Sequence, residues 1–118
     1  MEKENIVYDK SYRFAIRIVK LSNYLDEKHA YAISTQIVKC GTSIGANIAE
    51  SQQAQSRKDF ISKLSISLKE VSETIYWLNL LKDTSYISEA QYDSMINDCD
   101  EIGRLLTAII KSAKKDIE

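Results

Sequence analysis

Apolar residues recur along the chain in four stretches that have the spacing of one face of a helix. The stretches run from about Ile6 to Leu25, from about Tyr31 to Ser51, from Ser56 to about Asp83, and from Ser88 onward. Within each one, apolar positions step by three or four residues, the period of an amphipathic α-helix. The four stripes are Phe14, Ile18, Leu21 and Leu25; Ile33, Ile37, Cys40, Ile44 and Ile48; Ile61, Leu64, Leu68, Val71, Ile75 and Leu78; and Tyr92, Met95, Cys99, Ile102, Leu106, Ile109 and Ala113. The pattern predicts four helices.

The breaks between these stretches predict how the helices are connected. A charged segment, 26–29, separates the first two, while Ser56 and Ser88 stand where helix caps are expected. Links of about four to six residues force consecutive helices to lie antiparallel. The 118 residues include no proline and only three glycines, so the helices run uninterrupted. We predict one domain, residues 1–118, folded as an all-α, antiparallel, up-down-up-down four-helix bundle.

Composition narrows the class of protein. Hydrophobic residues make up 44% and charged residues 28%, with a net charge of -1, whereas a protein that coats nucleic acid is usually strongly basic. The charged start lacks the apolar core of a signal peptide, and no apolar run nears the ~20 residues that cross a bilayer. Cys40 and Cys99 stand far apart on apolar stripes. We expect reduced core thiols, a cytoplasmic location and no membrane contact.

The sequence gives little sign of catalysis. Gly41 to Gly45 matches G-x-S-x-G, the nucleophile elbow of α/β-hydrolases, but the motif lies inside a helical period and has no strand before it. It also needs a histidine downstream, and the only histidine, His29, lies upstream in a charged link. One histidine cannot supply the two Glu-x-x-His pairs of a di-iron bundle. We predict no catalytic residue, cofactor, metal or small-molecule substrate.

A polar strip borders the apolar stripe of the second helix. Ser43, Asn47 and Glu50 lie on neighbouring turns, and Lys63 and Glu70 share a face of the third helix. One interpretation is a hydrogen-bonded network that ties the two helices together, with Lys63 neutralising Glu50 or Glu70, and the other is a carboxylate site. We favour the network, in which losing one member would leave a buried charge unpaired, at about 3–5 kcal/mol.

The first helix carries the best basic stripe of the chain. Its members recur every three or four residues: Lys10, Arg13, Arg17 and Lys20. One interpretation is contact with the phosphates of RNA or DNA. The other, which we favour, is a solvated face or an ion-pair surface opposite acidic residues of the fourth helix, namely Asp93, Asp98, Asp100 and Glu101.

Two features of the helix surfaces concern packing. Gly41, Gly45 and Ala49 stand four residues apart on the second helix. A glycine inside a helix is about 1 kcal/mol less favourable than alanine, so the two glycines predict either a close approach of another helix or a weak spot in this one.

Several helices also carry more apolar residues than one stripe needs, which predicts self-association. The additional residues are Tyr12, Ala15 and Val19; Phe60, Ile66, Trp77 and Leu80; and Ile96, Ile110 and Ile117.

The most family-specific signal is a set of runs in the middle of the chain. They are Ser43-Ile44-Gly45-Ala46-Asn47-Ile48-Ala49-Glu50, then Ser56-x-Lys58-Asp59-Phe60-Ile61-x-Lys63-Leu64, then Lys69-Glu70 and Tyr76-Trp77-Leu78-x-Leu80-Leu81. Together they resemble the bacterial four-helix-bundle proteins encoded in intervening sequences of 23S ribosomal RNA genes, over about residues 11–114.

That resemblance implies a bundle assembled as a ring, with a homopentamer as the first expectation, and without known catalysis. A related branch, the accessory variability determinant of diversity-generating retroelements, binds nucleic acid through a strongly basic surface, from which this slightly acidic chain departs. We therefore expect a non-enzymatic, oligomeric, cytoplasmic bundle protein whose partner is a second copy of itself. The alternative is an RNA- or DNA-binding accessory protein that uses the first-helix stripe.

Overall fold

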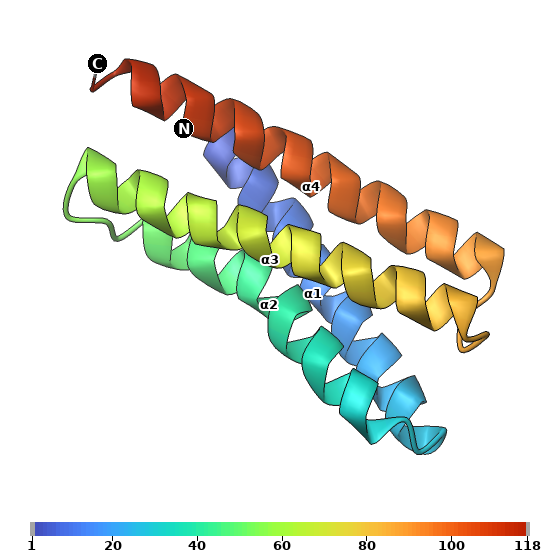
Figure 1. The fold of residues 1–118 in the computed structure, drawn as a ribbon. Coiled ribbons are helices and arrows are strands. Elements are labelled where there is room, and N and C mark those ends of the chain that lie inside the picture. Colours follow the sequence, from blue (N-terminus) through green and yellow to red (C-terminus); the bar gives the residue numbers. More distant parts are fainter. Residues whose placement is uncertain (1, 118) are drawn as a thin grey trace.

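The computed structural model describes residues 2–117, which form four helices joined by short turns. They are α1 (Glu2–Glu27), α2 (Tyr31–Ser51), α3 (Arg57–Asp83) and α4 (Glu89–Lys115). Consecutive helices run in opposite directions, so the predicted all-α four-helix bundle is confirmed (Figure 1). Only α1 differs clearly from its predicted bounds: it begins four residues earlier, because Glu2 and Glu4 in its first turn interact favourably with the helix dipole.

The four helices are arranged as two hairpins around one core. α1 packs on α2 and α4, α3 packs on the same two helices, and α1 and α3 stand diagonally opposite. The α1–α2 and α3–α4 turns lie apart at one end of the molecule (Figure 1). The largest fully buried side chains come from all four helices, among them Phe14, Ile44, Leu78 and Leu106. The two hairpins therefore share a single hydrophobic core.

Side-chain caps start α3 and α4 where the sequence predicts them. The Ser88 hydroxyl accepts a hydrogen bond from the Gln91 backbone amide, and the Gln91 side chain accepts one from the Ser88 backbone amide, so the two residues form a capping box. The Ser56 hydroxyl accepts from the Asp59 amide. Asp59 differs from a capping-box partner, because its carboxylate accepts from the amide of Gln55.

Hydroxyl side chains take several core positions that the apolar stripes assign to larger residues. Ser22, Ser34, Ser67 and Thr74 are buried, while their predicted neighbours Leu21, Ile33, Leu68 and Ile75 are only partly buried. A buried hydroxyl needs a hydrogen-bond acceptor. The Thr74 hydroxyl donates to the Glu70 carbonyl one turn earlier, and the Ser67 hydroxyl donates across to the Ile44 carbonyl of α2. Each of α1, α2 and α3 is thus rotated about its axis so that a small polar residue, rather than the larger apolar residue beside it, faces the core.

The glycines of α2 serve close packing against α1, one of the two outcomes that we predicted. A Cβ atom added to Gly41 would lie 2.8 Å from two carbons of the fully buried Ile18 side chain. One added to Gly45 would lie 3.1 Å from the Ser11 hydroxyl. The two helices therefore approach so closely at position 41 that a residue with a side chain would not fit there unless its neighbours moved.

Candidate functional site

The predicted basic stripe lies along the edge of α1 that borders α4. The Arg17 guanidinium donates to the Asp98 carboxylate at 2.6 Å and to the Ser94 hydroxyl at 2.8 Å, and the Lys10 ammonium lies 3.2 Å from the Glu101 carboxylate. Within residues 2–117, Arg13 and Lys20 form no ion pair. Two of the four cations thus bridge α1 to α4, and two remain available to another molecule.

The predicted polar strip is divided among separate local contacts. The Ser43 hydroxyl donates to the Lys39 carbonyl, and the Asn47 amide donates to the Ser43 carbonyl, so both bonds stay within α2. Of the predicted set, only Lys63 and Glu50 join α2 to α3, with 3.4 Å between ammonium and carboxylate. The polar tie that sequence reasoning missed is the buried bond from Ser67 to the Ile44 carbonyl.

Two details of the predicted network need correction. The Lys63 side chain is 31% exposed and that of Glu50 is 60% exposed, so the pair is not a buried charge and contributes at most about 1 kcal/mol. Lys63 also does not neutralise Glu70. Partial burial, followed by repulsion from Glu73, raises the pKa of Glu70, and Lys69 and Lys39 only partly oppose this shift. Glu70 and Glu73 therefore form a small acidic cluster on α3.

Three nucleophile-like groups, Ser43 and the two cysteines, are hydrogen-bonded within their own helix or buried. Ser43 sits in mid-helix with its hydroxyl bonded to its own helix, and His29 is exposed in the α1–α2 turn. Burial raises the pKa of Cys99 to about 12 and also raises that of Cys40, although a hydrogen bond with Thr74 opposes the Cys40 shift. Both cysteines are free thiols whose reactive thiolate form is disfavoured.

No enclosed chemical site stands out within residues 2–117. Their histidine, cysteine and acidic side chains form no group that could hold a metal ion, and none of the four helices has the length and apolarity to cross a membrane. A cleft of about 650 Å³ lies between α1 and α4, floored by Leu21, Ile87 and Met95 with Arg17 and Lys20 on one wall. It is an open trough between helices.

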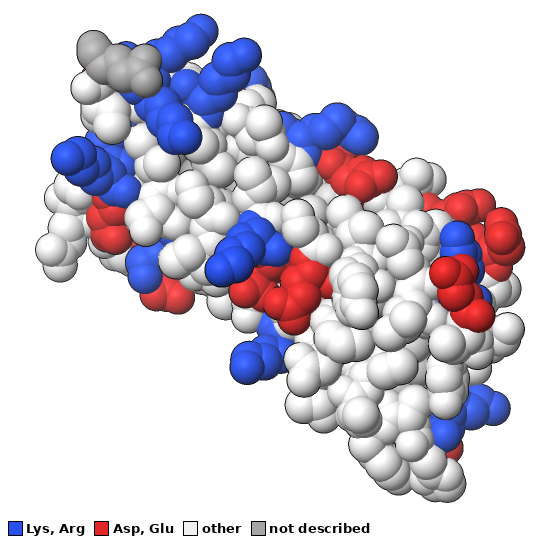
Figure 2. All heavy atoms as spheres, in the orientation of Figure 1, with Lys and Arg blue, Asp and Glu red and all other residues white. Residues whose placement is uncertain are grey.

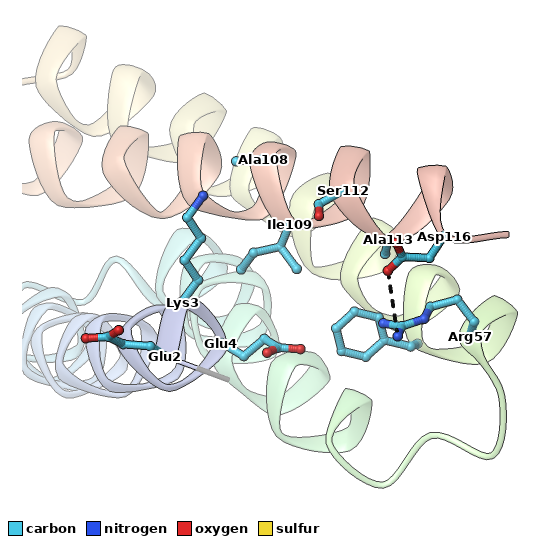
Figure 3. A pocket seen from close by; sticks show the side chains of 10 residues that line it. Glu2, Lys3, Glu4, Arg57, Ala108, Ile109, Ser112, Ala113 and Asp116 are labelled. Carbon is cyan, nitrogen blue, oxygen red and sulfur yellow. Dashed lines mark ion pairs between the residues drawn. The ribbon is translucent and has the colours of Figure 1, made fainter. Parts of the chain in front are cut away.

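A second hollow of about 370 Å³ lies at the end of the bundle where α1 begins and α4 ends. Its floor includes Ile109 and Ala113, and its rim carries charges of both signs (Figure 3). The Arg57 guanidinium stacks 5.5 Å from the Phe60 ring centre and pairs with Asp116 at 3.8 Å. Because the rim carries charges of both signs, it does not select a ligand of one charge.

Large apolar side chains are exposed mainly on α1 and α3. On α1, Tyr12, Ile16 and Val19 are 59%, 45% and 44% exposed and follow at helical spacing; we call them the α1 stripe. On α3, Ile66 and Tyr76 are 41% and 58% exposed. Figure 2 shows the α3 side of the molecule, where the surface over the first half of α2 is almost free of charge. Of the other surplus residues, Ile110 is buried and Ile117 is exposed at the end of the chain.

The fold and these surfaces define an all-α four-helix-bundle protein. The model of the 23S rRNA-intervening sequence protein family matches residues 3–108, so the chain belongs to that family. A crystal structure of a protein of unknown function from the S23 ribosomal protein family of Bacteroides thetaiotaomicron VPI-5482 is similar, with 55% identity and a TM-score of 0.90. That similarity covers 92% of this chain and 98% of the other. None of the curated proteins compared matches the chain significantly.

Proposed function

We propose that this protein is a non-enzymatic, self-associating helical bundle of the cytoplasm, whose partner is a second copy of itself. The observation that carries the proposal is the α1 stripe, three large apolar side chains left in water along two turns of one helix. Contiguous apolar surface of this kind marks interaction sites in folded proteins. A ring, with a homopentamer as the first expectation, is the assembly that the family resemblance favours.

The chemistry of the side chains supports the remaining parts of the proposal. Ser43 is hydrogen-bonded to its own helix, and burial raises the pKa of both cysteine thiols. Two free cysteines suit a reducing compartment, which supports the cytoplasmic location. We accordingly propose no cofactor and no small-molecule substrate.

The molar mass in solution tests self-association. Light scattering on a size-exclusion peak at micromolar concentration should give a multiple of the 13.5 kDa chain mass. The double variant Ile16→Gln/Val19→Gln should reduce that mass, because it replaces exposed apolar contact with amides. Thr107→Gln, on the exposed surface of α4, is the matched control and should leave the mass unchanged. A wild-type monomer at every concentration would reject the proposal.

A second candidate function, binding of RNA or DNA, is favoured by how charge is divided along α4. Residues 89–101 contain five acidic residues and no basic one, while residues 103–115 contain four basic residues and no acidic one. The basic four, Arg104, Lys111, Lys114 and Lys115, are exposed and form no ion pair within residues 2–117. Figure 2 shows basic side chains gathered where α4 ends.

Fluorescence anisotropy with labelled RNA and DNA tests this candidate, together with its first-helix alternative. Phosphate contacts predict binding that weakens steeply as salt rises. Neutralising Lys111, Lys114 and Lys115 to glutamine should weaken binding more than neutralising Lys10, Arg13, Arg17 and Lys20, because Lys10 and Arg17 are already paired. If the first-helix substitutions weaken binding more, the nucleic-acid site lies on the first helix. If neither set of substitutions changes binding, both surfaces are rejected.

A further inference from the structure

The exposed apolar residues of α1 and α3 lie on different faces of the bundle. The two helices stand diagonally opposite each other in the bundle. The α3 residues include Trp77, which is half-buried and whose ring packs edge-on against Tyr76 with 5.0 Å between ring centres. One molecule therefore presents two separate apolar surfaces, each on a different helix.

The charges beside these surfaces are opposite in sign. Arg13 and Lys20 flank the α1 stripe and form no ion pair within residues 2–117, although Asp9 lies one turn before Arg13. Glu70 and Glu73 lie between Ile66 and Trp77 on α3, and the Glu73 carboxylate accepts a hydrogen bond from the Trp77 indole at 3.3 Å. Partial burial and repulsion from Glu73 raise the pKa of Glu70, and neither carboxylate forms an ion pair within residues 2–117.

We propose that the two surfaces meet between copies: the α1 face (Tyr12, Arg13, Ile16, Val19 and Lys20) of one molecule packs on the α3 face (Ile66, Glu70, Glu73, Tyr76 and Trp77) of the next. This assignment rests on the proposed self-association and specifies its geometry. A contact between two unlike surfaces is head-to-tail, and it closes into a ring when its rotation allows. Arg13 and Lys20 then face Glu70 and Glu73 across an apolar centre.

The charges also disfavour the symmetric alternative. Arg13 and Lys20 lie on either side of Ile16 in sequence. An antiparallel contact between two α1 faces, centred near Ile16, would bring Arg13 of each copy toward Lys20 of the other. A contact between two α3 faces would oppose carboxylates in the same way. Because like charges across an interface suppress pairing, the head-to-tail contact is the favoured one.

Mixing two blocked variants tests the head-to-tail contact. Ile16→Gln/Val19→Gln blocks the α1 face and Ile66→Gln/Tyr76→Gln blocks the α3 face, all at exposed positions. Each variant alone should be monomeric. An equimolar mixture should form a dimer of about 27 kDa, twice the 13.5 kDa chain, because one intact α1 face meets one intact α3 face. Circular dichroism of each variant checks that the bundle is folded.

Other outcomes of the mixing experiment would overturn the assignment. If the α3-blocked variant keeps the wild-type mass, the α3 face takes no part, and if the folded variants form no new species on mixing, the two faces do not meet. A wild-type protein that is itself monomeric would instead reject the underlying self-association.

Charge reversal tests the same pairing without removing apolar surface. Arg13→Glu/Lys20→Glu should weaken assembly by about tenfold or more in dissociation constant, since it places like charges opposite each other. Adding Glu70→Lys/Glu73→Lys to the same chain restores opposite signs and should recover most of the loss. If the fourfold variant assembles no better than the first, the proposed pairing of charges is wrong.

Discussion

The two flanks of α1 are joined to the bundle by different kinds of contact. On the α2 side the backbones approach closely over Gly41 and Gly45, and the hydroxyls of Ser22 and Ser34 share a buried hydrogen bond of 2.6 Å. On the α4 side an open cleft is spanned by exposed ion pairs, with Arg17 37% and Asp98 45% exposed. Buried close packing tolerates little change in volume, while exposed ion pairs contribute little and are screened by salt. The α2 flank should therefore dominate stability.

The largest expected effect comes from adding one methyl group to the α1–α2 contact. Gly41→Ala should lower the free energy of unfolding by about 2 kcal/mol, because overpacking against Ile18 exceeds the gain in helix propensity. Urea denaturation at fixed protein concentration measures it.

The same change at Gly103 is the matched control. A Cβ there would lie 3.4 Å from the nearest carbon of Val71, an ordinary contact. Gly103→Ala should therefore raise stability by up to about 1 kcal/mol. Equal effects at positions 41 and 103 would contradict the close α1–α2 approach.

A smaller effect is expected from the shared hydrogen bond on the α2 flank. Ser34→Ala should cost about 1–2 kcal/mol, since it leaves the buried Ser22 hydroxyl without this partner. The double variant Ser22→Ala/Ser34→Ala should cost less than the sum of the two single variants. Strict additivity in the denaturation cycle would show that the two hydroxyls are not coupled.

The α4 flank should respond more weakly. Arg17→Gln should lower the free energy of unfolding by about 0.2–1 kcal/mol at low salt, and the difference from wild type should shrink in 1 M salt, where the Debye length is about 3 Å. Lys111→Gln, an exposed lysine on α4, controls for the loss of one positive charge. A loss as large as that of Gly41→Ala would refute the contrast between the flanks.

Near neutral pH the smallest effect concerns Cys99, which is buried between α3 and α4 with its thiol 3.8 Å from the Val71 carbonyl. Burial raises the pKa of its thiol from 9.0 to about 12 in the folded protein. The unfolded chain therefore loses this proton first, so stability is unaffected below about pH 9 and falls between pH 9 and 12. Comparison with Cys99→Ala isolates this contribution, and an identical alkaline slope in both proteins would argue against it.

Sequence reasoning locates the helices well, but it predicts less well which residues of each helix face the core. Ser88 and Gln91 define a helix start through local hydrogen bonds, and the structure has that capping box. Periodicity places Leu21 in the core in place of Ser22, because large apolar residues dominate the pattern. A serine can occupy such a position because its short side chain permits close approach and its hydroxyl finds an acceptor nearby.

The candidate site shows the same division between local and tertiary information. The spacing of Lys10, Arg13, Arg17 and Lys20 reveals a basic stripe, but only the structure shows that Arg17 and Lys10 are bound to α4 while Arg13 and Lys20 are not. The partner of a charged side chain depends on which helix lies beside it, and sequence spacing within one helix carries no information about that neighbour.

The sequence by itself determined four helices, their order, their caps and the all-α class, because each of these follows from local periodicity, capping and short links. The tertiary structure decided which flank of α1 is tightly packed, which cations are paired and which apolar residues remain exposed. These properties depend on the rotation of each helix about its own axis. That rotation is set by how all four helices fill one core together, as the fit of Gly41 against Ile18 shows.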